Sequence, residues 1–461
     1  MQILIGARLW ITDPTPEVKQ WCKSNLVVAN PEYARKKRLG FWTGNIPREI
    51  VMYEVWGDTW VVPYGCLKSL LSLAGKAAAD VTHAFRLQPP VFSAKVPLYD
   101  YQEAAVEHMS HAWYGILRSP AGSGKTQMGI ALAGRLGCRT LWLTHTIDLL
   151  NQSRERAERY INPALLGTIT AGKVTLGEAI TFATVQTLSR LDLSQYTDYW
   201  DCIIVDECHR VAGSPTAVTQ FSKVLNSLAA RHKYGLSATV HRADGLIKAT
   251  YSLLGEIEYT VPDAAVSKTT MQVTVQPVFT GIALSPQCLN SDGTLDYNSM
   301  IRYLTESKDR NRQIVAELIE NSGHSNLILS SRIEHLETLM SMLPAGLREV
   351  SVLITGKMTT KAGKAQRQQA IEDMRTGRKG YLFATYSLAK EGLDIPRLDR
   401  LYLVTPQKDY AVVVQSIGRI ARTFEGKSQP VAYDYVDATR GLEKAYKQRL
   451  RSYKKTGCKI I

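Results

Sequence analysis

The sequence predicts an α/β protein with two successive parallel sheets, preceded by a small α+β region. Between Val96 and about Pro262, short apolar runs such as YGILR, TLWLTH and DCIIVDE alternate with helical stretches. The alternation begins again near Ser299 with SNLILSS, VSVLIT and GYLFAT. Apolar runs without an alternating polar face are typical of strands covered on both sides, so we expect parallel sheets with crossover helices.

The composition favours a multidomain protein with a polyanionic partner. The 461 residues correspond to roughly three folded units, and 45% hydrophobic content can supply their cores. Lysine and arginine number 56 against 42 acidic residues, a formal charge of +14, so nucleic acid is the first partner to expect. No window approaches the roughly 18 apolar residues of a spanning helix, so we expect no membrane association. The seven cysteines lack a C-x-x-C pair, which favours reduced thiols in the cytoplasm.

Changes in pattern divide the chain into four expected segments. They are an accessory, DNA-binding α+β region at 1–95, a first α/β domain at 96–265, a linker at 266–298 and a second α/β domain with a basic tail at 299–461. The proline-rich stretch QPPVFSAKVP connects the first two.

The accessory region holds five of the eight tryptophans. Helix starts are expected at Pro16 and Pro31, and strands on either side of Gly57.

Two features of the chain ends leave alternatives open. Trp42, Trp56 and Trp60 are expected in the core of the accessory region, with base stacking on nucleic acid as the alternative. The run from Arg35 to Arg38 and the tail from Arg440 to Lys459 are basic. Phosphate contacts or a solvated helix face would each explain this charge.

A phosphate-binding loop is predicted at SPAGSGKT, which follows YGILR and precedes a helical stretch. The loop residues Ala121, Gly122, Ser123 and Gly124 would turn backbone N–H groups toward phosphate oxygens. Lys125 would reach the β and γ phosphates, and Thr126 would hold Mg²⁺. Ser119 stands where the pattern has glycine. The alternative is an ordinary glycine-rich turn beside a surface lysine.

An acidic pair later in the chain supports the same site. The apolar strand of DCIIVDECHR ends in Asp206 and Glu207. Asp206 would ligate Mg²⁺ through water, and Glu207 would orient and deprotonate an attacking water. ATP and Mg²⁺ are therefore the expected cofactors, although the same residues could simply cap a strand.

The motifs PAGSGKT, DECH and SAT, in that order, resemble motifs I, II and III of superfamily 2 helicases and translocases. SATVHRADG followed by LLGEIEYTV is similar to the branch that contains XPB, phage UvsW-type helicases and type III restriction motor subunits. ILSSRIEHLETL, FATYSLAKEGLDIPRLDRLYL and QSIGRIAR resemble motifs IV, V and VI. The resemblance runs from about Leu98 to Thr423 and implies two RecA-like domains of the P-loop NTPase class.

The resemblance also implies roles for further residues. Gln102, Gly392 and Asp394 would join the nucleotide site, while Gln415, Arg419 and Arg422 would complete the catalytic set with Lys125, Asp206 and Glu207. His209, Ser237 and Thr239 would couple the γ-phosphate to the strand, which Thr144, Thr184, Gln186, Thr187 and Arg332 would contact. Arg419 and Arg422 would act as arginine fingers from the second domain, so that both domains share one ATP; an exposed helix face is the alternative.

The function expected from this resemblance is an ATP-dependent DNA helicase or translocase that moves 3′ to 5′ and remodels branched or duplex DNA. Three alternatives remain: a motor subunit of a restriction or defence nuclease complex, an RNA helicase, and an ATP-gated clamp that does not travel. Expected partners are single-stranded, duplex or branched DNA, RNA, and a nuclease or recombination protein. A bacterial, phage or mobile-element origin and a cytoplasmic location are expected.

Overall fold

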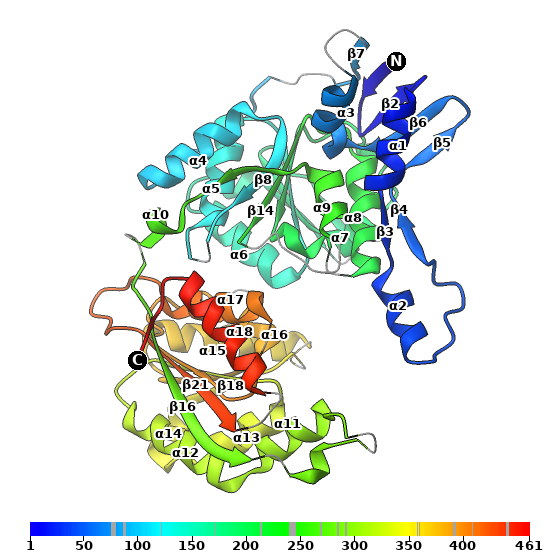
Figure 1. The fold of residues 1–461 in the computed structure, drawn as a ribbon. Coiled ribbons are helices and arrows are strands. Elements are labelled where there is room, and N and C mark those ends of the chain that lie inside the picture. The colour runs from blue at the N-terminus through cyan, green and yellow to red at the C-terminus, as the bar shows by residue number, and fades with distance from the viewer. Residues whose placement is uncertain are drawn as a thin grey trace. The chain divides into compact units, whose positions relative to one another are not determined.

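The computed structural model describes the chain except residues 75–79, 86–88, 121, 171, 213, 239–245, 268–269, 284, 291–292, 357, 359, 391–392, 408 and 439–441. The chain forms two compact units, one of residues 1–120 and 124–262 and one that contains residues 263–461 (Figure 1). No described helix is long and apolar enough to cross a membrane.

The first unit is built on an eight-stranded sheet in the order β11-β10-β12-β9-β13-β14-β8-β15. The strands are β8 (Tyr114–Arg118), β9 (Thr140–Thr144), β10 (Leu166–Thr170), β11 (Lys173–Thr175), β12 (Ile180–Thr184), β13 (Cys202–Asp206), β14 (His232–Ser237) and β15 (Ile257–Thr260). Every pair is parallel except β10 with β11. All residues of β9, β12 and β13 are buried, as the continuous apolar runs predict.

Helices cover both faces of this sheet. They are α4 (Asp100–His111), α5 (Lys125–Leu136), α6 (Ile147–Ala157), α7 (Val185–Leu188), α8 (Pro215–Ser227) and α9 (Ile247–Leu254). Helices α7, α8 and α9 share one core with Leu141 and Leu143. Gly129 of α5 lies on the opposite face, against Trp142 and Leu236. The sheet is therefore the central layer of an α/β sandwich.

The residues expected as an accessory region belong to this first unit. They form a five-stranded sheet in the order β5-β6-β2-β1-β7 and a two-stranded sheet of β3 with β4. The elements are β1 (Gln2–Ile5), β2 (Arg8–Thr12), α1 (Pro16–Asn25), β3 (Val27–Ala29), α2 (Pro31–Arg38), β4 (Glu49–Val51), β5 (Glu54–Trp56), β6 (Thr59–Pro63), α3 (Leu67–Ala74) and β7 (Asp80–His83).

Buried contacts join this region to the eight-stranded sheet. The Tyr64 hydroxyl donates to the Arg231 carbonyl at 2.8 Å, and the Lys233 ammonium donates to the Ala7 carbonyl at 2.9 Å. The Tyr64 ring packs edge-on against Tyr114 of β8. The N-terminal sheet therefore shares a core with the first α/β sheet.

The prediction that three tryptophans lie in the core of the N-terminal region is correct for Trp60 and wrong for Trp42 and Trp56. Trp60 is 8% exposed and stacks on Tyr53 with 5.0 Å between ring centres. Trp42 is 84% exposed because it lies in the loop after α2, and Trp56 is 62% exposed on the edge strand β5.

The second unit contains a seven-stranded parallel sheet in the order β18-β19-β17-β20-β21-β16-β22. The strands are β16 (Thr274–Ala283), β17 (Asn326–Ser330), β18 (Ser351–Ile354), β19 (Tyr381–Thr385), β20 (Arg400–Leu403), β21 (Val431–Ala438) and β22 (Lys459–Ile460). Its helices include α10 (Asp263–Ser267), α11 (Tyr297–Glu306), α12 (Lys308–Glu320), α13 (Ile333–Ser341), α14 (Ala345–Glu349), α15 (Lys361–Thr376), α16 (Tyr386–Lys390), α17 (Tyr410–Ile420) and α18 (Leu442–Lys455).

Strand β16 comes from the segment 266–298 that we expect as a linker. It enters the sheet because it pairs with β21 over most of its length, a partner some 150 residues further along the chain. The predicted α/β class with two parallel sheets is confirmed.

Candidate active site

The SPAGSGKT loop lies between strand β8 and helix α5, as predicted. Gly122 and Gly124 have φ of 84° and 79°, values that favour glycine. Ser119, at the position where the pattern has glycine, does not have a positive φ. Its N–H donates to the Ser237 carbonyl at 2.9 Å and the residue is fully buried, so a side chain is tolerated there. Ala121 lies outside the described residues.

The acidic pair lies beside the lysine of this loop. Strand β13 ends at Asp206, and the Lys125 ammonium is 3.9 Å from the Glu207 carboxylate. Asp206 is 4% exposed and accepts hydrogen bonds from the Glu207 N–H at 2.9 Å and the Ser153 hydroxyl at 3.3 Å. Burial and the Glu207 charge raise the pKa of Asp206 to about 7, and Lys125 opposes the rise.

These residues fit a magnesium ion. Mg²⁺ prefers hard oxygen ligands, and Asp206 and Thr126 supply a buried carboxylate and a hydroxyl. The described hydrogen-bond donors to Asp206 are both neutral, while the neighbouring Glu207 charge disfavours its ionisation. A cation bound here would stabilise the ionised Asp206.

Glu207 has an unusual backbone conformation and a histidine beside its carboxylate. Its φ of 50° and ψ of 50° are left-handed, which is costly for a residue with a side chain and is concentrated at functional sites. The His209 Nδ1 atom lies 3.2 Å from the Glu207 carboxylate and 3.0 Å from the Ser237 hydroxyl. His209 therefore links the acidic pair to the end of β14, whereas Thr239 lies outside the described residues.

Gln102 lies beside the phosphate-binding loop and is only 3% exposed. Its carboxamide oxygen accepts the Tyr99 N–H at 2.9 Å and caps α4. Its Nε2 atom faces Gly124, because a Cβ at Gly124 would lie 2.5 Å from it. The glutamine is thus fixed against the loop, and glycine is required at 124 both for φ and for space.

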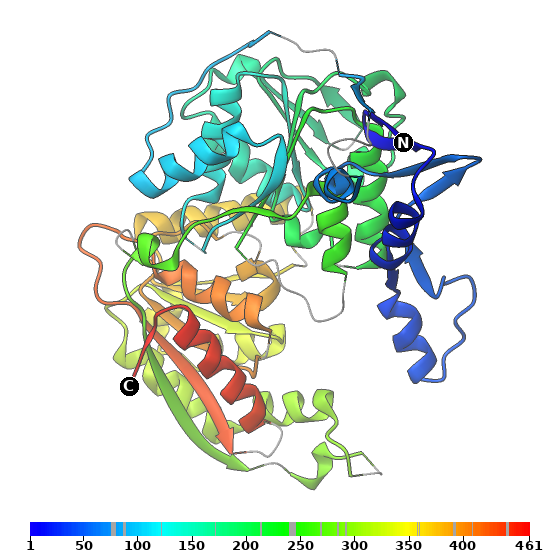
Figure 2. The same ribbon diagram turned by 45° about the horizontal axis from the view of Figure 1, so that its top comes forward.

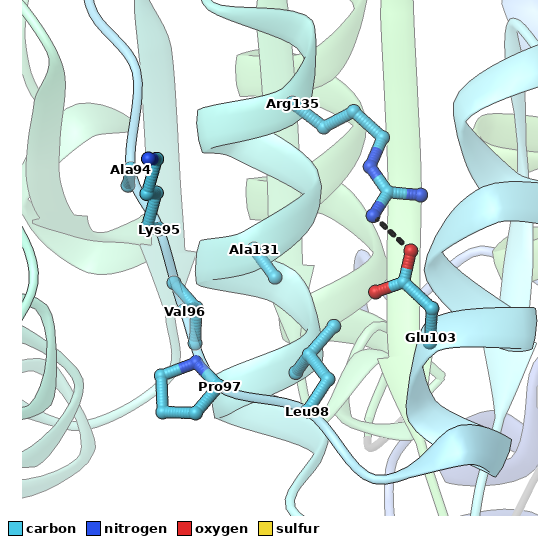
Figure 3. A pocket seen from close by; sticks show the side chains of 8 residues that line it. All are labelled: Ala94, Lys95, Val96, Pro97, Leu98, Glu103, Ala131 and Arg135. Atoms are coloured by element: carbon cyan, nitrogen blue, oxygen red, sulfur yellow. Dashed lines mark hydrogen bonds and ion pairs between the residues drawn. The ribbon is translucent and has the colours of Figure 1, made fainter.

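An open pocket of about 550 Å³ lies next to α4 and α5 (Figure 3). It is lined by Ala94, Lys95, Val96, Pro97, Leu98, Glu103, Ala131 and Arg135. Glu103 and Arg135 form an ion pair at one side of it. Its described lining includes none of the predicted nucleotide-binding residues, so we assign it no part in that site.

A second polar cluster lies where β9 and β12 end. Thr184 caps α7, and its hydroxyl is 2.9 Å from that of Thr187. The Gln186 amide is 3.1 Å from Nδ1 of His145, whose pKa is lowered by burial and by Arg210.

Thr144 does not present its hydroxyl to solvent. It is fully buried and donates to the carbonyl of Thr146 at 3.0 Å. Its hydroxyl stabilises the turn after β9, and a direct contact with a nucleic-acid strand is excluded in this conformation.

In the second unit, Asp394 is surrounded by arginines. Its carboxylate forms an ion pair with Arg422 and lies 3.6 Å from Arg375. The Arg419 guanidinium donates to the Leu393 carbonyl at 3.2 Å. The ion pair of Asp394 with Arg422 therefore connects the segments that resemble motifs V and VI.

The remaining predicted residues of this unit are Gln415, Arg332 and Gly392. Gln415 of α17 is 8% exposed, and its amide oxygen has no hydrogen-bond partner among the described residues. Arg332 precedes α13 and donates to the Asn298 side chain at 3.1 Å. Gly392 lies outside the described residues.

Comparison with protein families assigns both units. The family described as "Type III restriction enzyme, res subunit" matches residues 95–242, and "Helicase conserved C-terminal domain" matches residues 309–424. The chain belongs to the superfamily 2 helicases. The helicase is accordingly an ATP-dependent nucleoside triphosphate hydrolase.

Relatives agree with this assignment. A probable helicase of Escherichia phage T5 is 25% identical over 350 residues, covering 75% of this chain and 73% of that protein. The DNA 3′-5′ translocase XPB2 of Sulfurisphaera tokodaii is 22% identical over 370 residues, covering 72% and 80%. The solved structure of S. cerevisiae Dbp5 bound to RNA and ADP BeF3 has a TM-score of 0.55 at 18% identity, covering 79% and 90%. The shared fold is a pair of RecA-like domains.

Three features of the helicase site were not predicted from the sequence. Ser153 of α6 donates to Asp206, His145 contacts Gln186, and Arg375 pairs with Asp394. His145 and Ser153 follow closely after Thr144, one of the residues predicted to contact nucleic acid, so their position in the chain could have suggested them. Arg375 lies outside the quoted motifs, and only the folded chain brings it to Asp394.

Proposed function

We propose that the helicase couples ATP hydrolysis to 3′ to 5′ movement on DNA and to the remodelling of branched or duplex DNA. The observation that carries this proposal is the group of Lys125, Glu207, His209 and Ser237, in which each side chain lies within 4 Å of the next. Such a chain can transmit a change at the γ-phosphate to the end of β14.

Within this proposal, the first unit supplies the phosphate and water-activating groups. The loop N–H groups and Lys125 bind the phosphates, and Mg²⁺ held by Thr126 and Asp206 would reduce the charge repulsion around them. Glu207 orients a water and accepts its proton. The Lys125 ammonium and the His209 ring lie beside the Glu207 carboxylate, at 3.9 Å and 3.2 Å.

The second unit completes the site in this proposal. Arg419 and Arg422 would stabilise charge on the transferring phosphoryl group, a contribution of about 10³ to 10⁵ in rate in other systems. Gln415 would contact the γ-phosphate or the water, and Gly392 and Asp394 would line the nucleotide. Arg422 must exchange its contact with Asp394 for phosphate, so hydrolysis would depend on closure of the two units.

DNA and the 3′ to 5′ direction are supported by relatives and by charge. XPB2, which matches 72% of the chain, is named a DNA 3′-5′ translocase. The formal charge of +14 favours a polyanion. Thr184, Gln186, Thr187 and Arg332 would contact the strand. The free thiols of all seven cysteines fit a reducing compartment such as the cytoplasm.

One alternative has its own support. Residues 95–242 match a restriction-enzyme subunit family, so the chain could serve as the motor of a nuclease complex. Purification from its native source with a stoichiometric nuclease would favour that function over an independent helicase.

Substitution of Glu207 tests the proposal. Glu207→Gln removes the proton acceptor and should lower nucleic-acid-stimulated kcat by about 10²-fold or more while retaining ATP binding. Glu178→Gln, an exposed position of the same unit, is the matched control. ATPase rates are measured with single-stranded DNA, forked DNA, duplex DNA and RNA, and strand displacement with 3′- and 5′-tailed duplexes.

Two results would contradict the proposal. Normal hydrolysis by E207Q would exclude Glu207 as the base. Stimulation by RNA alone, or displacement only from 5′ tails, would exclude the proposed substrate or direction.

A further inference from the structure

Residues 30–48 form an arm that projects from the N-terminal region. Helix α2 is carried at the end of the β3–β4 ribbon, away from the eight-stranded sheet of its own unit (Figures 1 and 2). None of the residues of α2 is buried. The arm therefore contributes little to the core, and its sequence must be explained by something else.

The base of the arm is rigidly closed. Asn30 is 3% exposed; its N–H donates to the Arg48 carbonyl at 3.0 Å and its amide donates to the Pro47 carbonyl at 2.9 Å. Its carboxamide oxygen caps α2 by accepting the Glu32 N–H at 3.0 Å. One side chain thus fixes both ends of the arm.

The β3–β4 ribbon that carries the arm packs on the α/β part of the first unit. Val28 of β3 shares a small core with Ala212 and Val218. Ala212 follows His209 of the DECH motif by three residues. The ribbon that carries the arm is therefore anchored on the segment that follows the acidic pair.

The positive charge of α2 has no ion-pair partner among the residues that the structure describes. Arg35, Lys36, Lys37 and Arg38 form four consecutive cations in its last turn. None of them forms an ion pair with any residue that the structure describes. Cations near a helix C-terminus are favourable, but Arg35 and Arg38 lie three residues apart and repel each other, so an external anion would stabilise this turn.

Two aromatic rings follow these cations and face solvent. The Phe41 N–H donates to the Lys36 carbonyl and the Gly40 N–H to the Lys37 carbonyl, which is the Schellman arrangement at a helix end. Phe41 would normally pack on an apolar residue at position 36, but that position is lysine and Phe41 is 64% exposed.

Trp42 is held in place although it is 84% exposed. Gly44, with φ of 44°, lies directly under its indole ring, where a Cβ would collide with the ring. The loop therefore orients the ring and leaves most of it accessible to a ligand.

We propose that this arm binds nucleic acid at a junction, with the α2 cations on backbone phosphates and Phe41 and Trp42 stacked on unpaired bases. The inference rests on the proposed function and adds its substrate class, DNA in which single strands meet a duplex. Aromatic faces bind bases that are unstacked, and the adjoining cations match the adjacent phosphates. Four cations beside two rings complement a nucleic-acid strand better than an apolar protein surface.

The test measures equilibrium binding of the full-length protein without ATP. The probes are a labelled fork with single-stranded arms and a blunt duplex of equal length. Phe41→Ala/Trp42→Ala should weaken fork binding by about 30-fold or more, equivalent to about 2 kcal/mol of stacking from two rings, and change duplex binding less than about twofold. Trp56→Ala, also an exposed tryptophan of this region, is the control and should leave fork binding unchanged.

A second variant tests the cations independently of the rings. Lys37→Ala/Arg38→Ala should reduce the slope of log affinity against log salt by about 1.8, the value for two duplex phosphates. Lys19→Ala/Lys23→Ala, with the same change of charge on exposed positions of α1, should leave the slope unchanged.

Unchanged fork binding by the double aromatic variant would overturn the proposal. The proposal would also be overturned if the parent protein bound anionic phosphatidylserine vesicles and the double aromatic variant lost that binding while it still bound the fork normally. That result would identify a membrane-binding arm. Because no ATP is present, these results do not depend on Glu207. Failure of the E207Q test would therefore contradict the proposed hydrolysis and leave the arm's binding measurable.

Discussion

Lys233 provides a pH-dependent test of how the N-terminal region is joined to the motor. The side chain is fully buried at the start of β14 and donates to the carbonyls of Ala7 at 2.9 Å and Leu225 at 2.7 Å. Burial lowers the pKa of Lys233 from 10.5 to about 7. Since each unit of pKa corresponds to about 1.4 kcal/mol, the protonated side chain costs the fold about 5 kcal/mol.

The direction of the pH dependence follows from proton binding. Between pH 7 and 10.5 the unfolded chain holds the Lys233 proton and the folded chain does not. The free energy of unfolding should therefore rise with pH in this window, by up to about 1.4 kcal/mol per pH unit, and the charge penalty should be fully present below pH 7.

Lys233→Met removes the titrating group and leaves the Ala7 and Leu225 carbonyls unpaired, at about 1–3 kcal/mol each. Near pH 7 these losses are partly offset by the lost charge penalty, so the variant should be close to the parent in stability. The parent's advantage should then widen by about 1.4 kcal/mol per pH unit up to about pH 9.5.

Urea unfolding followed by tryptophan fluorescence measures this difference. All eight tryptophans lie between Trp10 and Trp200, so the signal reports the first unit alone. Lys19→Met, at an exposed lysine of α1, is the control. Parallel stability profiles for the parent and K233M from pH 7 to 9.5 would refute the reasoning.

Two further substitutions probe close packing and buried charge. Gly65→Ala should lower the stability of the first unit by about 1–3 kcal/mol, because the new Cβ would lie 2.7 Å from the Ser252 carbonyl oxygen of α9. Tryptophan fluorescence should show a lower Tm, and an unchanged Tm would contradict this packing. Asp437→Asn should cost the second unit about 3–5 kcal/mol, since Arg310 and Asp437 are both fully buried and 2.7 Å apart. Far-UV circular dichroism should show this loss while the fluorescence transition stays in place, and a shift of the fluorescence transition instead would contradict it.

Much of the nucleotide site in the first unit could be predicted because its residues lie in short, continuous segments of the sequence. A strand, a glycine-rich turn and a helix start occupy consecutive residues, so Gly124 and Lys125 could be placed before any fold was known. Asp206 and Glu207 follow an apolar run that is buried at every position. In a parallel sheet the carboxyl ends of strands share one edge, so β8 and β13 bring their loops together.

The exposure of Trp42 and the burial of Thr144 were decided by long-range packing. Composition favours a buried tryptophan, but Trp42 is 84% exposed and follows a helix in which no residue is buried. Thr144 follows a motif pattern that suggests a strand contact, yet the neighbouring backbone takes its hydroxyl. The hydrogen bond from Thr144 to Thr146 is local, but the burial of Thr144 also depends on β12, whose Ala183 carbonyl lies 3.5 Å from the Thr144 hydroxyl.

The sequence alone specifies the α/β class, through the pattern of apolar residues, and the residue types of the nucleotide site, through the motifs. Both can be predicted because each pattern is contained within a few consecutive residues. Three contacts arise only when the chain folds. Lys233 joins the N-terminal region to the eight-stranded sheet, β16 enters the second sheet, and Ser153 donates a hydrogen bond to Asp206. Each is a contact between segments at least 50 residues apart, so the energy that selects it is absent from any local pattern.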